Sequence, residues 1–144
     1  MQLSRFTDLG LRAMMLLAAA GSTTRVTTRY IAVSVNASEH HVARAVTRLA
    51  ELECVDVKRG RGGGLFLTDV GRTMSVGALV RVLERDSEVV ACAGEHPCPL
   101  IVACRLRRAL ADAQEAFYAE LDRHAVTDLG TPALLSLTAR SSFP

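Results

Sequence analysis

Apolar residues recur at helical spacing along most of the chain, and strict alternation is confined to one short stretch. The first helical pattern covers residues 6–20, with Thr7 as a suitable N-cap and Asp8 as an acidic residue in the first turn. The predicted buried face consists of Leu9, Ala13, Leu16, Leu17 and Ala20. Because the helical period dominates, we predict a mainly α-helical protein.

Two further helices joined by a turn are predicted between residues 27 and 52. Thr28 can cap the first helix, and Ser38 can cap the second after a turn at residues 34–37. The buried face of the second helix consists of Val42, Ala45, Val46, Leu49 and Leu52. The opposite face carries His40, His41, Arg44, Thr47 and Arg48. Such a polar, basic face is either solvated or placed in the major groove of DNA.

A basic hairpin is predicted directly after these helices. Residues 55–57 and 65–67 have strand patterns, and the segment from Lys58 to Gly64 reads KRGRGGG. Glycines permit tight turns, and Arg59 and Arg61 at the tip can reach a minor groove or phosphates. The alternative is a merely flexible hairpin. A helix–turn–helix followed by a basic hairpin is the winged-helix arrangement, which favours DNA binding.

The predicted DNA-binding residues come from the two helices and the hairpin. They are Thr28, Ser38, His40, His41, Arg44, Arg48, Lys58, Arg59 and Arg61. Charge is distributed in agreement with this prediction. Residues 1–84 carry eleven Lys/Arg against seven Asp/Glu, a net +4, whereas residues 85–144 carry six against eight, a net −2. A basic N-terminal part indicates a nucleic-acid-binding module joined to a second part of different chemistry.

Two helices are predicted in the rest of the chain. Ser75 can cap one that runs to Glu84, and a long one is expected from about Pro99 to Asp122. The long helix has an apolar stripe made by Leu106, Leu110, Ala113, Phe117 and Leu121. The stripe can pack on its own domain or on a second copy, and we predict a homodimer through Leu106–Leu121. The predicted division is a DNA-binding domain at 1–84, a cysteine-rich loop at 85–104, and a dimerisation helix with a tail at 105–144.

Composition narrows the class of protein. About half of the 144 residues are apolar (49%), and tryptophan is absent. No apolar run is long enough to cross a membrane, and the N-terminus lacks the pattern of a signal peptide. We therefore expect no membrane partner and a cytoplasmic protein with reduced thiols. No nucleophile and base stand in a recognisable setting, so we do not predict an enzyme.

Three of the four cysteines lie in one short segment. Cys92, Cys98 and Cys104 are each separated by five residues, and Gly94, Pro97 and Pro99 interrupt any continuous helix. A loop that folds back can bring three thiols together, which in a reducing compartment favours a metal or iron–sulfur site over a disulfide. The alternatives are small buried side chains, or a structural zinc site completed by His96 or Asp8. We predict that Cys54, which lies apart, is a core residue.

The combination of these segments resembles a known family, the winged-helix iron–sulfur repressors. The likeness is carried by LSRFTDLGLRAMMLLA near the N-terminus, KRGRGGGLFLTDVG at the hairpin, and CAGEHPCPLIVACRLRRALADAQEAFY around the cysteines. It extends to about residue 130 and is strongest to the nitric-oxide sensors of the family.

The resemblance implies a cofactor, a set of ligands and a signal. It implies a dimer that represses a palindromic operator and carries one [4Fe–4S] cluster per subunit, held by the thiolates of Cys92, Cys98 and Cys104. Asp8 would supply the fourth ligand across the dimer, and nitrosylation of the cluster would release DNA. Relatives with a histidine three residues after the third cysteine bind their cluster differently, and here Arg107 stands at that position. The alternatives are a [2Fe–2S] cluster, zinc, or a repressor that senses iron or cluster supply.

Overall fold

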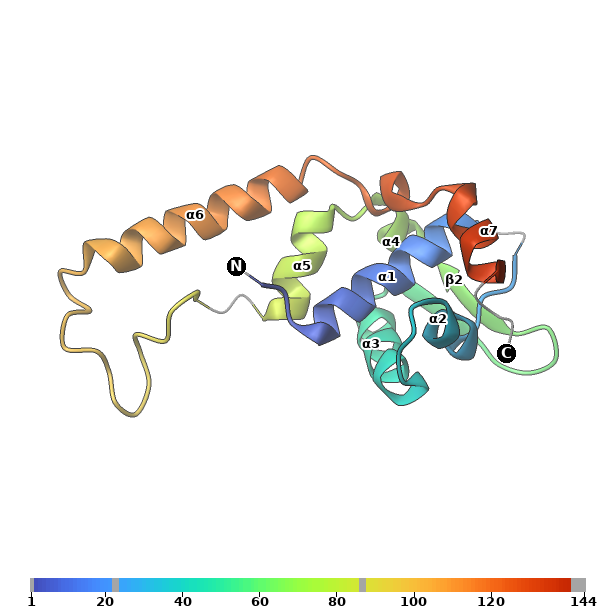
Figure 1. Ribbon diagram of the computed structural model, residues 1–144, viewed down its shortest axis with the longest axis horizontal. Helices are drawn as coiled ribbons and strands as arrows, with labels where there is room; N and C mark the ends of the chain where they lie inside the picture. Colours follow the sequence, from blue (N-terminus) through green and yellow to red (C-terminus); the bar gives the residue numbers. More distant parts are fainter. Residues whose placement is uncertain (1, 22–23, 86–87, 141–144) are drawn as a thin grey trace.

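Helix α1 (Arg5–Ala20) runs through the middle of a helical domain, and the other elements pack around it (Figure 1). The computed structural model describes residues 2–21, 24–85 and 88–140. The remaining helical elements are α2 (Thr28–Ser34), α3 (Glu39–Glu51), α4 (Asp69–Thr73), α5 (Val76–Glu84), α6 (Arg105–Leu121), the 3-10 turn η1 (Val126–Leu129) and α7 (Pro132–Arg140). Strands β1 (Val55–Lys58) and β2 (Gly64–Leu67) form a two-stranded antiparallel sheet. The prediction of a mainly α winged helix–turn–helix is confirmed.

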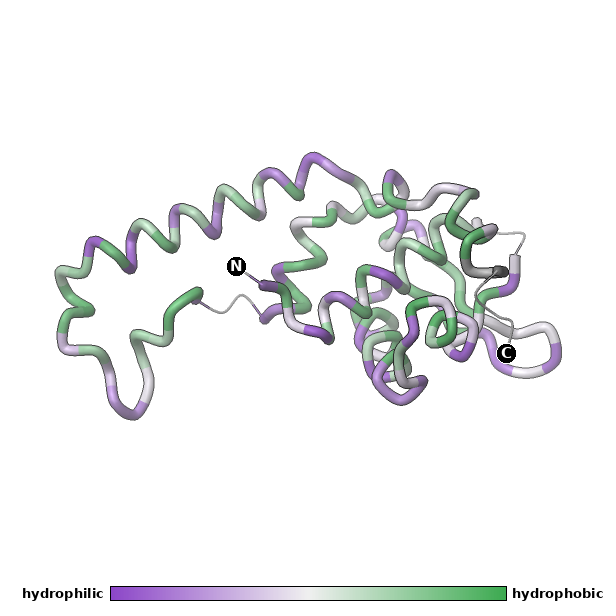
Figure 2. The backbone as a smooth tube through the Cα atoms, viewed as in Figure 1, coloured by the Kyte–Doolittle hydropathy of each residue, from purple (hydrophilic) through white to green (hydrophobic). Residues whose placement is uncertain are grey.

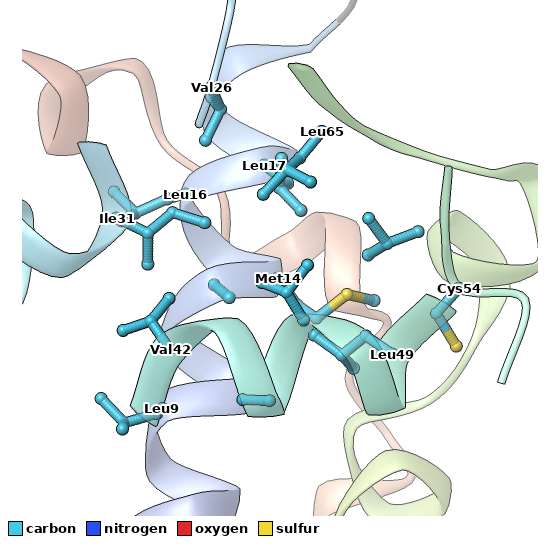
Figure 3. Packing of buried hydrophobic residues seen from close by; sticks show 14 of the residues in the cluster. Leu9, Met14, Leu16, Leu17, Val26, Ile31, Val42, Leu49, Cys54 and Leu65 are labelled. Atoms are coloured by element: carbon cyan, nitrogen blue, oxygen red, sulfur yellow. The ribbon is translucent and has the colours of Figure 1, made fainter. Parts of the chain in front are cut away.

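The predicted apolar face of α1 is buried. Its members Leu9, Ala13, Leu16, Leu17 and Ala20 all belong to the core. Figure 3 shows Met14 and Leu49 side by side where α1 and α3 pack, with Cys54 at the edge of the same cluster. Cys54 is fully buried, as the sequence predicted. Burial of this cluster is the main favourable contribution to folding of the domain.

The start of α1 differs from the prediction. Ser4, not Thr7, is the N-cap, and its hydroxyl oxygen accepts a hydrogen bond from the backbone N–H of Thr7. Thr7 is itself fully buried and lies inside the first turn. Asp8 remains in the first turn, where its charge suits the helix dipole.

The helix–turn–helix and the hairpin lie where they were predicted. The cap of α2 is Thr27 rather than Thr28, because the Thr27 hydroxyl accepts from the Tyr30 N–H. Ser38 occupies the N-cap position of α3 without a side-chain cap bond. In the hairpin, Val55 pairs with Leu67 and Lys58 with Gly64. Gly60 and Gly62 have φ of 92° and 85°, a conformation that side-chain-bearing residues rarely adopt.

Helix α6 and the segment before it stand away from this domain (Figure 1). The helix begins at Arg105, later than predicted, because residues 98–103 form two turns. In these the N–H of Ile101 donates to the Cys98 carbonyl at 3.1 Å, and the N–H of Ala103 donates to the Leu100 carbonyl at 3.2 Å. Cys104 is the N-cap, its sulfur accepting from the Arg107 N–H. Cysteine is not among the usual capping residues, so the composition gave no sign of this start.

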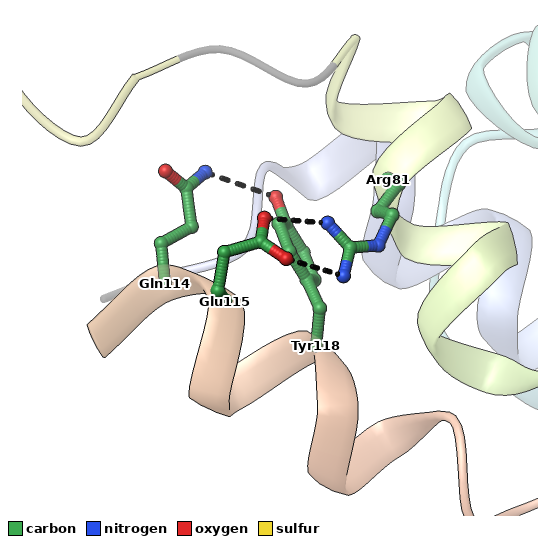
Figure 4. A network of polar contacts seen from close by, with 4 residues as sticks. All are labelled: Arg81, Gln114, Glu115 and Tyr118. Atoms are coloured by element: carbon green, nitrogen blue, oxygen red, sulfur yellow. Dashed lines mark hydrogen bonds and ion pairs between the residues drawn. The ribbon is translucent and has the colours of Figure 1, made fainter. Parts of the chain in front are cut away.

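The C-terminal half of α6 packs on α5 through one compact contact. Tyr118 is buried, and the Arg81 guanidinium lies over its ring at 4.2 Å from the centroid. The same guanidinium holds both carboxylate oxygens of Glu115, at 2.8 and 2.9 Å, and Gln114 bonds the Tyr118 hydroxyl at 3.1 Å (Figure 4). Gly77 permits the close approach, since a Cβ there would lie 2.5 Å from the Tyr118 carbonyl oxygen. Within the described part of the chain, no helix is long and apolar enough to span a bilayer.

Candidate DNA interface and cysteine loop

The exposed face of α3 carries most of the polar residues that the sequence assigned to DNA. Ser38, His40, His41 and Arg44 are exposed at or near the start of the helix. Further along α3, Arg48 is only part-exposed, and one of its nitrogens lies 2.9 Å from a carboxylate oxygen of Glu51. The first turns of α3 thus present exposed polar side chains, whereas Arg48 near its end is held by Glu51. Recognition helices use their first turns to contact bases in the same way.

The second predicted region, the hairpin tip, is also open. Lys58, Arg59 and Arg61 are exposed, and the Lys58 ammonium lies 5.1 Å from the centroid of the Phe66 ring. Arg25, which sequence analysis missed, donates a hydrogen bond from its Nε to the carbonyl of Gly63. This bond ties the hairpin to the segment before α2. No local pattern marks Arg25, because its partner lies 38 positions away in the sequence.

Thr28 occupies a different environment from the other predicted DNA contacts. It is half-buried in the first turn of α2, beside the true cap Thr27. The structure therefore leaves less of its side chain available than the sequence suggested. Apart from Arg48, the other predicted contacts form an exposed set along the start of α3 and the hairpin tip, in which the guanidinium and imidazole groups can reach phosphates and base edges.

The cysteine loop is partly closed. The N–H of Cys98 donates to the Cys92 carbonyl at 3.0 Å, which turns the chain back between these two residues. Cys92, Cys98 and Cys104 are each half-buried free thiols. Across residues 2–21, 24–85 and 88–140, however, no three His, Cys, Asp or Glu side chains form a group arranged to hold a metal ion. The three thiols are therefore close in sequence, but within one chain they do not form a metal-binding group.

An ion pair fastens the beginning of this loop to α6. The Arg107 guanidinium donates two hydrogen bonds to the Glu88 carboxylate, the one from Nε measuring 3.1 Å. The bond from Arg107 lowers the pKa of Glu88 below its usual range. The pKa of Arg107 is raised, first by the bond to and charge of Glu88 and then by the charges of Cys92 and Cys104. Arg107 thus lies near Cys92 and Cys104 as well as Glu88.

Asp8 is engaged within its own helix. A carboxylate oxygen of Asp8 lies 2.7 Å from Arg12 Nε, and both side chains are about half exposed, at 45% and 49%. Asp8 does not join the cysteines of the same chain in a metal-binding group. His96 is exposed on the cysteine loop. Cys54 is remote from this chemistry, and burial raises the pKa of its thiol, so it remains protonated and unreactive.

The side chains of the loop have the chemistry that an iron–sulfur cluster requires. Thiolates are the usual ligands of such clusters, and three half-buried thiols lie on one segment of thirteen residues from Cys92 to Cys104. Thiolates also bind zinc. The donor set fits either group, and an oxygen ligand from outside the loop would complete it.

A recognition helix followed by a basic hairpin defines a winged-helix DNA-binding regulator. The family model for Rrf2, described as an iron-dependent transcriptional regulator, matches residues 3–132, and the chain belongs to this family. It is therefore a transcription regulator and not an enzyme.

Named relatives agree with this assignment. The chain is 55% identical to the HTH-type transcriptional repressor NsrR of Streptomyces coelicolor, covering 99% of each chain. It is 36% identical to the HTH-type transcriptional regulator NsrR of Geobacillus kaustophilus, covering 90% of this chain and 89% of that one.

Solved structures confirm the fold. CymR, the global cysteine regulator of B. subtilis, matches with a TM-score of 0.69 at 26% identity, covering 90% of this chain and 95% of that one. IscR of T. potens matches with a TM-score of 0.69 at 20% identity, covering 100% and 93%.

Proposed function

We propose that this protein is a homodimeric, iron–sulfur-dependent transcriptional repressor that responds to nitric oxide. In this proposal each subunit holds one [4Fe–4S] cluster and releases operator DNA when the cluster is nitrosylated. The observation that carries the proposal is the loop with its three accessible thiols, fastened to α6 by the pair of Glu88 and Arg107. It is supported by the iron-dependence in the family description and by the name of the two relatives.

The ligands in this proposal are Cys92, Cys98 and Cys104 from one subunit and Asp8 from the other. Three thiolates leave one metal position for a weaker oxygen ligand. When bound, the cluster would supply an iron atom that a small diatomic molecule can attack. Asp8 is half exposed on α1, so it can be reached by another subunit once its bond to Arg12 rearranges. Arg107 would offset part of the negative charge that several thiolates bring together.

The homodimer is supported by apolar side chains that one chain leaves in water. Leu100, Val102 and Leu106 are 70%, 95% and 65% exposed, and they follow one another along the end of the cysteine loop and the start of α6. Figure 2 shows apolar stretches on this part of the chain, away from the core of the domain. A cavity of about 510 Å³ between the loop and α6 adjoins them. A second copy of α6 would cover these residues. Of the three, Leu106 belongs to the predicted apolar stripe, whose members Phe117 and Leu121 pack against α5 within the same chain.

In such a dimer the two copies of α3 would address two half-sites of a palindrome, and the hairpins would contact the flanking DNA. The cysteine loop directly precedes α6, and α6 is held to α5 by Arg81, Glu115 and Tyr118. A change in the loop can therefore alter how the two winged domains are spaced. That spacing is what a palindromic operator would measure.

The test is one titration with two readings. Anaerobically purified protein is treated with nitric oxide, and visible absorbance and anisotropy of a labelled duplex are recorded in the same sample. The duplex is selected from a random-sequence library with the untreated protein. We expect a brown protein that binds the duplex and releases it as the absorbance changes.

Three other outcomes contradict the proposal. A colourless protein that contains zinc would replace the cluster with a structural metal. A coloured protein could stay bound to DNA during nitrosylation and release it only when a chelator removes iron. Such a protein would be a sensor of iron or cluster supply. Release of DNA by nitric oxide in a Cys92→Ala variant that contains no iron would show that the response does not use this site.

A further inference from the structure

A basic cavity lies beside the recognition helix, and two of its arginines, Arg5 and Arg85, are outside the set of residues that the sequence assigned to DNA. It has a volume of about 460 Å³ and is lined by the start of α1, the start of α3 and the end of α5. These three segments lie on the same side of the domain (Figure 1). The basic side chains that line it are Arg5, His41, Arg44 and Arg85. All four are exposed, so a ligand in solution can reach them.

The positive charge of this cavity is not neutralised from within. Three arginines and one glutamate, Glu84, line it, which leaves a net charge of +2 with His41 neutral (3 − 1 = 2). Glu84 is already engaged, since its carboxylate accepts the backbone N–H of Ser4 at 2.7 Å. Burial alone would raise the pKa of Glu84, but hydrogen bonds from Thr7 and Ser4 lower it, so Glu84 is ionised at neutral pH.

Of the arginines that the structure describes, those of the cavity are among the ones that form no ion pair with a carboxylate. Arg12, Arg48, Arg81, Arg107 and Arg123 each form an ion pair with a carboxylate. Among the described residues, Arg5, Arg44 and Arg85 have no such partner, although they converge on one cavity. Three positive charges that share one carboxylate, Glu84, leave an excess that is destabilising in the free protein, and an anion relieves that cost.

We propose that this cavity binds a phosphate of the DNA backbone at the edge of the groove that α3 enters. The inference rests on DNA binding by α3, the part of the proposed function that the fold carries. Arg44 belongs to both surfaces, because it lines the cavity and is exposed on the face of α3 that carries His40 and His41. A duplex that places α3 in its major groove brings the phosphates beside that groove toward Arg44, and hence toward Arg5 and Arg85.

The chemistry of the cavity fits this ligand. Guanidinium groups form paired, charge-assisted hydrogen bonds to phosphate oxygens. Three elements contribute, so the contact fixes the orientation of the whole domain on DNA and not only that of α3. A phosphate contact carries no base information of its own. Arg5 and Arg85 therefore set affinity and register, whereas α3 and the hairpin set sequence preference.

The test compares Arg5→Gln, Arg85→Gln and the double variant with Arg123→Gln. Arg123 lies beyond the end of α6 and its side chain is 74% exposed, so this control removes the same charge elsewhere. Binding of the selected duplex and of an unrelated duplex is measured at several salt concentrations. We expect the slope of log affinity against log salt to fall by about one unit for each lost contact. Both duplexes should lose affinity by the same factor, and Arg123→Gln should keep the wild-type slope.

Two further measurements make the result decisive. Arg5→Lys and Arg85→Lys keep the charge and should keep the salt slope, which separates the contact from a defect in folding. In a set of selected duplexes, a neutral methylphosphonate replaces one phosphate at a time. At one position this replacement should weaken DNA binding by the wild type but not by the double glutamine variant.

The proposal is overturned if both glutamine variants keep the wild-type slope, or if affinity falls for the selected duplex alone. It is also overturned if the variants bind DNA as tightly as the wild type once preparations of equal iron content are compared. Binding to an unrelated duplex requires neither nitric oxide nor a particular signal. A failure of the nitric-oxide response would therefore leave this result standing, and the two failures can be told apart.

Discussion

The domain built around α1 and the arm formed by residues 88–121 differ in how far their apolar side chains are buried. In the domain, Met14 and Leu49 are fully buried and the predicted apolar faces meet one another. In the arm, Val102 is 95% exposed, and three half-buried thiols form no metal-binding group within one chain. The domain completes its core from its own residues, whereas the arm carries surfaces and ligands that need something from outside. This difference fits the proposed role of the arm as a sensor attached to a DNA-binding module.

The contacts that hold the two regions together combine an ion pair with an apolar cluster. The pair of Arg81 and Glu115 joins α5 to α6, and Tyr118 is buried against Val76 and Val80 of α5. Exposed ion pairs contribute about 0–1 kcal/mol each, and burying one large apolar side chain contributes about 1.5–3 kcal/mol. The apolar cluster therefore contributes more to holding the arm on the domain than the ion pair does.

The largest expected effect separates the cysteines of the two regions. Replacing Cys92, Cys98 or Cys104 by alanine should abolish binding of iron, because each change removes one thiolate. Cys54→Ala should retain full iron and sulfide content, since that thiol is buried in the domain. Anaerobic iron and sulfide analysis of the four variants is the measurement. Loss of iron from Cys54→Ala, with retention in any of the other three, would reverse the assignment.

The second comparison concerns leucines that differ in burial. Leu49→Ala should lower the free energy of unfolding by about 2–5 kcal/mol, because it leaves a cavity in the core. Leu106, at 65% exposure, should change the stability of one chain by no more than about 0.5 kcal/mol when replaced by alanine. If α6 forms the dimer, the same Leu106→Ala change should weaken dimerisation by about tenfold or more. Urea unfolding and analytical ultracentrifugation check the two parts, and an unchanged dimer would remove Leu106 from the interface.

The third expected effect is a response to acid at the junction of the two regions. The hydrogen bond from Arg81 lowers the pKa of Glu115 below its usual range. A group with a lowered folded pKa stabilises the folded state fully above its unfolded pKa of about 4.3 and loses that contribution as pH falls through the folded pKa. We therefore expect the α5–α6 contact to loosen below about pH 4 while the core persists.

Tyrosine emission can report this change, because the chain has two tyrosines and no tryptophan. In a Tyr30→Phe background the emission comes from Tyr118 alone, which touches Arg81. The acid transition should be present with Glu115 and absent in the Glu115→Gln variant. If both proteins show the same midpoint, another group controls the contact.

The sequence predicted the elements whose pattern is local, so that residues close together in the chain define each helix face or turn. The apolar faces of α1, α3 and α5 and the hairpin of β1 and β2 follow from periodicity and turn residues. The errors fall at helix starts. Ser4 and Thr7 are both capping residues, and only packing shows that Thr7 is buried and Ser4 is the cap. The start of α6 was placed too early because cysteine is an unusual cap.

The ion pairs that hold the arm in place carried no signal in the sequence. Arg81 and Glu115, which join α5 to α6, are 34 positions apart, and Glu88 and Arg107, which both lie in the arm, are 19 apart. Neither pair has the spacing of three or four that marks an ion pair along one helix. The cysteine spacing, by contrast, predicted that the three thiols lie on one loop. It did not predict their arrangement in space, because a loop has no fixed period.

The smallest expected effect on stability belongs to Asp8, which lies in the domain but is proposed to serve the arm of a second subunit. If Asp8 only complements the dipole of α1 and pairs with Arg12, Asp8→Ala should cost about 0.3–1 kcal/mol and leave the absorption spectrum unchanged. If Asp8 is a ligand, the same small cost should come with an altered spectrum and an altered rate of reaction with nitric oxide.

A heterodimer distinguishes ligation within a subunit from ligation across the dimer. Asp8→Ala and Cys92→Ala chains, each with a different tag, are mixed and the mixed dimer is isolated. Its only complete set of three cysteines lies on the Asp8→Ala chain, which faces the intact Asp8 of the Cys92→Ala chain. Ligation across the dimer therefore predicts a wild-type spectrum from half the wild-type iron. The spectrum of the Asp8→Ala homodimer, seen instead in the mixed dimer, would exclude ligation across the dimer, because the intact Asp8 of the partner chain would then have no effect on the cluster.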